Sequence, residues 1–188
     1  MAKDKVVGTP TNINMLSPLG FKFMINKLPN TNFFIQSINL PGLNLGEVDT
    51  QTPFTRLPFA GDHITFQDLT ISFRVDEDLA NYKELFDWMI ALGFPESYDQ
   101  SRQIYNTSNN ITSAAGGDTV FSDATLMILN SAMQSNIQCT FKEIVPVSLS
   151  DIPFDVRAGD VDYVEATASF RYRVYNICLL YTSPSPRD

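Results

Sequence analysis

The chain has 188 residues, 44% of them hydrophobic, which is enough for one domain with a buried core. The 13 Lys and Arg against 21 Asp and Glu give a formal net charge of -8, and without a basic cluster this disfavours tight nucleic-acid binding. No segment approaches the ~20 apolar residues of a membrane-spanning helix, and two cysteines are too few for a disulfide scaffold, which favours a reducing cytoplasm.

Residues 1–18 are expected to form a loose lead-in segment. They contain Gly8, Pro10 and Pro18 but few alternating apolar positions. The first ten residues lack the apolar stretch of a signal peptide, so the protein should remain in the compartment where it is made.

A β hairpin is predicted next. Apolar residues occupy alternate positions from Phe21 to Ile25, residues 28–32 supply a turn, and residues 33–38 form the return strand. The Leu-Pro-Gly sequence at residues 40–42 then ends this strand.

Residues 43–59 are expected to form an exposed or edge-like excursion. Pro53 and Pro58 occupy positions that a central strand would not accept. The Ala-Gly-Asp sequence at residues 60–62 supplies a turn, and a long strand follows over residues 64–75. In the second half of that strand every other residue is apolar, which is typical of a strand with one buried face.

One amphipathic helix is predicted up to Gly93, and it should pack against a sheet. Its apolar positions recur at helical spacing and are Leu79, Tyr82, Leu85, Phe86, Met89 and Ile90. The acidic residues 76–78 precede it. We interpret their carboxylates as caps of the positive helix end in preference to metal ligands.

The rest of the chain predicts a loop, a second hairpin and a long strand. Residues 96–120 are rich in Ser, Asn and Gly and indicate one long irregular loop. Residues 124–130 and 136–144 form the hairpin, and residues 145–160 form a connection punctuated by Pro and Asp. Residues 164–177 are the longest strand candidate.

Residues 178–188, CLLYTSPSPRD, replace the β pattern with a Ser- and Pro-rich segment. The string resembles the in-frame translation of a common transposase-based sequencing adapter, so we interpret it as a non-native tail. A genuine flexible tail is the alternative. Residues 1–177 are then one predicted domain.

No catalytic, cofactor-binding or metal-binding residue is predicted. The only histidine, His63, follows a Gly-Asp step before a strand, where a surface position is most common. The chain contains no phosphate loop, dinucleotide fingerprint or nucleophile elbow. A structural protein without catalytic activity is therefore expected.

Four sequence blocks carry a family resemblance. They are Leu-Pro-Gly at 40–42, Phe-Ala-Gly-Asp at 59–62, TFQDLTISF at 65–73 and Phe-Asp-Trp at 86–88. In this order they resemble the tail-tube proteins of T4-like contractile-tailed bacteriophages. The resemblance covers residues 19–92 well and residues 136–177 more loosely, and the loop at 96–120 has no counterpart.

The resemblance implies a mainly β, antiparallel sandwich or barrel-like fold with one flanking α-helix and an extended loop or hairpin arm. Six copies would close into a ring, and stacked rings would form a tube that conducts DNA during ejection. The implied partners are further copies of the chain and the tail sheath, baseplate and tape-measure proteins, with transient passage of DNA. The implied location is the phage tail of the virion, after assembly in the bacterial host cytoplasm.

In the family an extended segment between early strands reaches the adjacent ring, and residues 45–59 occupy that place here. Six residues of this segment are expected to be exposed in one copy and buried between subunits: Val48, Pro53, Phe54, Leu57, Pro58 and Phe59. Pairing of strand edges around a closed ring would also remove the hazard of exposed edges.

Other functions remain open. A tube-initiating baseplate protein or a tail terminator would share the fold and form a single ring. A baseplate carbohydrate-binding module would present aromatic platforms or paired carboxylates in one cleft. The net charge of -8 fits a tube lumen that repels phosphates, and it fits ordinary solubility equally well.

Overall fold

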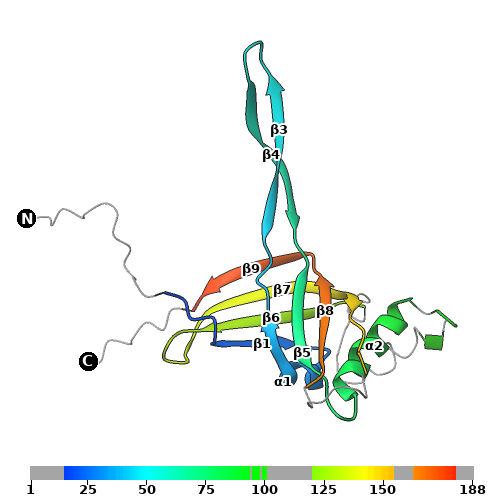
Figure 1. The fold of residues 1–188 in the computed structure, drawn as a ribbon. Coiled ribbons are helices and arrows are strands. Elements are labelled where there is room, and N and C mark those ends of the chain that lie inside the picture. Colours follow the sequence, from blue (N-terminus) through cyan, green and yellow to red (C-terminus); the bar gives the residue numbers. More distant parts are fainter. Residues whose placement is uncertain (1–14, 94, 98, 101–119, 155–162, 181–188) are drawn as a thin grey trace, which may run out of the picture.

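Antiparallel strands make up most of the described chain. The computed structural model describes residues 15–93, 95–97, 99–100, 120–154 and 163–180. Figure 1 shows a body of curved strands, a long hairpin that projects from it, and helix α2 at its side. The predicted mainly β, antiparallel fold is therefore confirmed. Most of the predicted lead-in and of the predicted loop at 96–120 lies outside the described residues.

One half of the body consists of four strands, which are β1 (Phe21–Ile25), β6 (Ser122–Leu129), β7 (Ser135–Leu149) and β9 (Val174–Leu179). β1 pairs with β6, β6 pairs with β7, and the first half of β7 also pairs with β9. The connection between β6 and β7 is the predicted second hairpin, which is confirmed.

The other half contains β2 (Ile35–Ile38), β5 (Leu69–Arg74) and β8 (Glu165–Arg171). β2 pairs with β5, β5 pairs with β8, and β8 pairs with the second half of β7. Because β7 takes part in both halves, the strands of the body form one seven-stranded sheet.

A bend in β7 lets the sheet curve around its core. At Glu143 the backbone has a φ of 56°, a value that few residues other than glycine adopt. The Glu143 amide donates to Oδ1 of Asp123 at 3.1 Å, and its carboxylate accepts from Nε of Arg173 at 2.8 Å. These contacts stabilise the bend where the chain also passes from β8 to β9.

The core is formed by side chains from both halves of the sheet, together with Leu85 and Trp88 of α2. The largest fully buried side chains include Phe73, Phe141 and Phe170, which come from β5, β7 and β8. Burial of each such side chain contributes about 1.5 to 3 kcal/mol. The predicted alternation in β5 is confirmed, because Leu69, Ile71 and Phe73 are all fully buried.

The first predicted hairpin is wrong. Residues 29–34 form helix α1 (Pro29–Phe34), and β2 pairs with β5, whereas β1 pairs with β6. The physical reason is a contact with Glu84, which is far away in the sequence. The carboxylate of Glu84 accepts from the Thr31 amide at 3.3 Å and from Nδ2 of Asn30 at 2.7 Å, which satisfies polar groups at the start of α1.

The predicted helix is confirmed as α2 (Ala80–Gly93), but its buried face differs from the prediction. Leu85 is buried as expected, whereas Phe86 and Leu79 are exposed, and the other buried positions are Asn81, Trp88 and Ala91. Leu79 precedes the helix with a φ of 55°. The buried face of α2 is thus displaced toward Trp88. The Trp88 Nε1 donates to the Val120 carbonyl at 3.3 Å.

The predicted acidic cap of this helix is also wrong. The first turn of α2 contains no acidic residue. Residues 76–78 precede the helix, and Asn81 makes the local contacts there. Its Oδ1 accepts from the Asp76 amide at 3.2 Å, and its Nδ2 donates to the Arg74 carbonyl at 2.7 Å.

Four further boundaries differ from the sequence analysis. β7 continues beyond residue 144 to Leu149, because Pro146 lies at a register shift, where the missing amide is tolerated. The predicted strand at 64–75 ends and restarts around Gln67. The predicted strand at 164–177 is divided at residues 172–173. β9 extends to Leu179 and so includes the first two residues of segment 178–188, while residues 181–188 lie outside the described part.

Candidate intersubunit surface

A two-stranded hairpin, here called the arm, stands apart from the body (Figure 1). It consists of β3 (Leu43–Gln51) and β4 (Arg56–Phe66), paired in antiparallel register and joined by residues 52–55. It extends beyond the segment 45–59 that the sequence indicated. The turn predicted at residues 60–62 is wrong, because these residues lie within β4.

The turn at the tip of the arm is closed by two threonines. The Thr52 amide donates to the Thr55 carbonyl at 3.1 Å, and the Thr55 amide donates to Oγ1 of Thr52 at 3.2 Å. Pro53 and Phe54 lie between them. The side chain of Phe54 is 99% exposed, which leaves an aromatic ring at the end of the arm.

The outer part of the arm has one apolar and one polar face. Val48 pairs with Phe59 and Thr50 with Leu57, and because these pairs are two residues apart they share one face. The alternate pairs, Asp49 with Pro58 and Gln51 with Arg56, face the other way. On this second face Oδ2 of Asp49 lies 4.0 Å from Nη1 of Arg56.

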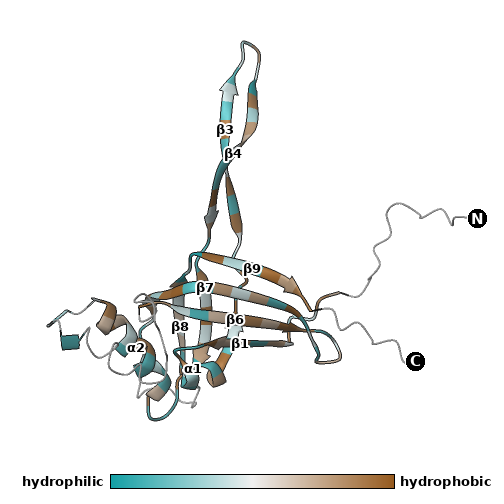
Figure 2. Cartoon of the chain, turned by 180° about the vertical axis from the view of Figure 1, so that it is seen from behind, coloured by the Kyte–Doolittle hydropathy of each residue, from teal (hydrophilic) through white to brown (hydrophobic). Residues whose placement is uncertain are grey.

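All six residues that the sequence singled out are exposed. Val48, Leu57 and Phe59 share the apolar face at 59%, 48% and 52% exposure. Pro53 and Phe54 lie at the tip, and Pro58 lies on the opposite face. The apolar residues therefore recur along the hairpin (Figure 2). Their contact with a second copy stays a prediction.

The sequence analysis did not identify further exposed apolar residues nearer the body. Leu43, Leu45 and Ile64 are about half exposed, and Leu45 lies opposite Ile64. The alternation of apolar residues at 43–45 already indicated a strand there. The predicted turn at 60–62 concealed the pairing of this strand with residues 64–66. An isolated two-stranded hairpin is marginal in water, so uncovered apolar faces of this length indicate an interaction surface.

A bulge twists the arm near its middle. The register shifts between Leu45 and Glu47, and the opposite strand contains Gly61 there. A Cβ atom at Gly61 would lie 2.6 Å from the Gly46 carbonyl oxygen, which is closer than real Cβ contacts. Glycine is therefore required for this close approach of the two backbones.

An aromatic cluster, here called the arm root, joins the arm to the body. Its members are Phe66, Phe141, Tyr172 and Tyr175. Phe66 lies 5.8 Å from the ring of Tyr172 and 5.9 Å from that of Tyr175, and Phe141 stacks on Tyr175 at 5.4 Å. Such contacts contribute about 0.5 to 1.5 kcal/mol each beyond burial, so they hold the foot of the arm in place.

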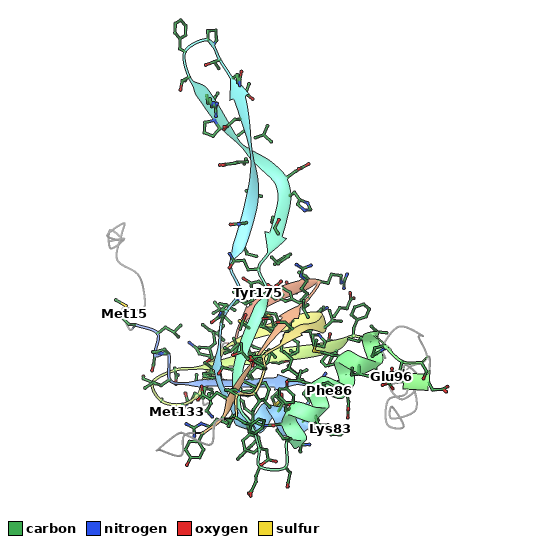
Figure 3. The ribbon with its side chains drawn as sticks, turned by 45° about the vertical axis from the view of Figure 1, so that its right-hand side comes forward. Met15, Lys83, Phe86, Glu96, Met133 and Tyr175 are labelled. Atoms are coloured by element: carbon green, nitrogen blue, oxygen red, sulfur yellow. The ribbon has the colours of Figure 1, made fainter. Side chains whose placement is uncertain are left out.

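Hydrogen bonds from the arm root reach the backbone on both sides of the arm. The Tyr172 hydroxyl donates to the Gln67 carbonyl at 2.9 Å, and the Tyr175 hydroxyl donates to the Pro41 carbonyl at 3.1 Å. Figure 3 shows Tyr175 at the foot of the arm. Both chain segments that enter the arm are thus tied to the body.

The surroundings of the arm root favour the protonated form of Tyr172. Burial, followed by the neighbouring Tyr175 and Asp68, raises the pKa of Tyr172 to about 12. Asp68 itself is paired, with its Oδ1 3.2 Å from Nε of Arg171. The Tyr172 hydroxyl therefore remains a hydrogen-bond donor through the neutral and mildly alkaline range.

The described part of the chain shows no evident catalytic or metal-binding site. No three His, Cys, Asp or Glu residues among the described ones lie close enough to hold a metal ion. His63 lies exposed on β4, and not in a turn. No described helix has the length and apolar character needed to cross a membrane.

Comparisons with known proteins identify related folds. A family model described as phage tail tube protein matches residues 9–178. A chain in the cryo-EM structure of the anti-feeding prophage baseplate, 6-fold symmetrised, is similar at a TM-score of 0.55 and 15% identity, over 89% of this chain and 97% of that one. No curated protein gives a significant match.

Two other similar chains come from an extracellular contractile injection system. A chain in its sheath-tube complex in the extended state has a TM-score of 0.54 and 13% identity, covering 88% of this chain and 93% of that one. A chain in its sheath/tube terminator has a TM-score of 0.56 and 15% identity, covering 89% and 99%. At these identities the likeness shows a shared fold.

Proposed function

The chain belongs to the phage tail tube protein family, and we propose that it is a structural subunit of a tail tube in which rings of identical copies stack and enclose a channel for DNA. The observation that carries this proposal is the arm. Its apolar face, with Val48, Leu57 and Phe59, is covered by no other described part of the chain, and identical neighbours can cover it.

Closure into a ring is supported by the edges of the sheet. Among the described residues β1 pairs with β6 alone, β2 with β5 alone and β9 with β7 alone, which leaves three strands with an open side. Open strand edges pair readily with other chains, and a closed ring satisfies them. We propose six copies per ring, in line with the 6-fold symmetry applied to the baseplate that contains a similar chain.

The proposed role requires no catalysis. In the assembled tail the tube would contact sheath, baseplate and tape-measure proteins, and DNA would pass through without specific binding. A net charge of -8 is consistent with weak attraction for phosphates. Assembly would take place in the host cytoplasm, and the product would reside in the virion.

Electron microscopy of the purified protein tests this function. Long tubes of uniform diameter are expected at high protein concentration. A protein that stays monomeric under all conditions, with the arm folded onto its own body, would contradict the proposal.

A second candidate is a tube terminator or initiator, which forms one ring and stops. The similar chains come from a sheath-tube complex, a terminator and a baseplate, so the shared fold fits these roles equally. The same micrographs separate them, because a terminator or initiator would give single rings where a tube subunit gives long tubes.

A further inference from the structure

An aromatic groove lies at the end of the body opposite the arm. It has a volume of about 840 Å³ and lies between α1, the end of β5 and the residues before β8. Three of its aromatic side chains are strongly exposed, namely Phe33 at 85%, Phe154 at 81% and Tyr163 at 73%. In a single copy these rings therefore remain largely in contact with solvent.

The arm and the groove occupy the two ends of β5. β5 begins at Leu69, directly after the foot of the arm, and ends at Arg74, which lines the groove. Figure 1 shows the arm and α1 at opposite ends of the body. A contact between the tip of one copy and the groove of the next is therefore heterologous and can repeat along a stack.

The groove carries charges of both signs. Its lining includes Asp76, Glu77 and Arg74. Nε of Arg74 makes no hydrogen bond among the described residues and lies 3.9 Å from the carboxylate of Glu165, while the guanidinium lies 4.6 Å from the ring of Tyr163. The groove thus offers both acidic and basic side chains next to its aromatic ones.

The tip of the arm offers the matching groups. The side chain of Arg56 is 74% exposed and that of Asp49 is 49% exposed. Their mutual distance of 4.0 Å is at the limit of an ion pair, and such exposed pairs contribute little. Both charges can therefore exchange partners when Phe54, between them along the chain, enters an apolar site.

We propose that the groove is the acceptor for the arm tip of a second copy. This inference rests on the proposed tube function and names the surface that its arm contacts. Phe54 enters among Phe33, Phe154 and Tyr163, Arg56 pairs with Asp76 and Glu77, and Asp49 pairs with Arg74. The contact joins unlike ends of two copies, so one copy can be an acceptor and a donor at once.

Mixing of two variants tests the proposal. Phe54→Ser removes the ring of the tip, and Phe154→Ser with Tyr163→Ser removes two rings of the groove. These three side chains are exposed, so both variants should keep the melting temperature of the unmodified protein. Phe86→Ser, which removes a half-exposed ring from α2, is the matched control and should form normal tubes.

Each variant alone should form tubes at a level reduced by about tenfold or more, as for loss of an interface hot spot. In the mixture, the intact tip of the groove variant meets the intact groove of the tip variant. Assemblies of two joined units that grow no further are therefore expected in sedimentation and electron microscopy. Arg56→Glu should also prevent tubes, and Asp76→Lys with Glu77→Lys in the same chain should restore them.

Normal tubes from the groove variant, with none from the tip variant, would overturn this inference and leave the proposed function standing. A mixture that gives no joined units would overturn it as well. Normal tubes from Phe54→Ser would remove both the groove contact and the role of the arm tip.

Discussion

Val48 lies directly opposite Phe59 across the two strands of the arm, on a face that the rest of the described chain leaves uncovered. In a core such a pair would stabilise the fold of one molecule. Here its burial can stabilise only a complex, so substitutions on this face separate folding from assembly.

Replacement of Phe54 and Phe59 by Ser should leave the monomer folded and prevent tube formation. Both side chains are at least half exposed, so the free energy of unfolding should change by no more than about 0.5 kcal/mol. Circular dichroism measures the first effect and electron microscopy the second. Phe86→Ser with Phe121→Ser removes two other exposed rings and should assemble normally. Normal tubes from the arm variant would remove the arm from the assembly.

Gly61→Ala should damage the arm and spare the body. The added Cβ would lie 2.6 Å from the Gly46 carbonyl oxygen, and overpacking of this kind costs about 1 to 3 kcal/mol. Amide hydrogen exchange should accelerate along β3 and β4, while amides of β5 and β8 stay protected. Gly93→Ala is the control, since no atom apart from the adjacent backbone of its own helix lies within 4 Å of its Cβ position. Equal exchange in the two variants would show that the bulge is dispensable.

Tyr172 should make the protein sensitive to alkali. Its pKa is about 12 in the folded chain and near 10 when unfolded, so the folded state holds the proton more tightly. The resulting stability is complete below pH ~10 and is lost as pH rises toward ~12. Urea titrations across this pH range should show a fall in the free energy of unfolding of the unmodified protein and a smaller fall for Tyr172→Phe. Tyr82→Phe, which also loses a hydroxyl bonded to a carbonyl, controls for the loss of one hydrogen bond at neutral pH.

Glu84→Gln should weaken the junction of α1 and α2. The carboxylate accepts hydrogen bonds from Asn30 and Thr31, and bonds to a charged group contribute about 1.5 to 3 kcal/mol before correction for its partial exposure. We expect a loss of about 1 kcal/mol in urea unfolding. Asp87→Asn removes an exposed ion pair with Lys83 on the same helix and should cost less than about 0.5 kcal/mol. A larger loss from the control would contradict this account.

Local periodicity predicted those strands that need only an apolar surface against one face, whichever element supplies that surface. Leu69, Ile71 and Phe73 alternate and are buried because any sheet that covers one face of β5 satisfies them. α1 could not be predicted in this way. Its start depends on Glu84, 53 residues away from Thr31, and no local pattern encodes that contact.

The same distinction applies to the candidate site. The exposure of the six arm residues could be predicted because the family resemblance placed an arm at residues 45–59 and because a core strand excludes the two prolines of this segment. The groove was not recognisable, because Phe33, Phe154 and Tyr163 come from three separate segments that only the folded sheet brings together. The bulge at Gly61 was missed because an Ala-Gly-Asp sequence resembles a turn.

The attachment of the arm also determines how the molecule bears a mechanical load. Phe141 of the arm root lies on β7, and β7 is hydrogen-bonded to β6, β8 and β9. A pull along the arm reaches β2 and β5 through the chain itself, and the aromatic contacts of the arm root pass part of it to β7 and its neighbours. A filament of such subunits would resist stretching as a whole sheet does, and its weakest link under tension would be the joint between molecules.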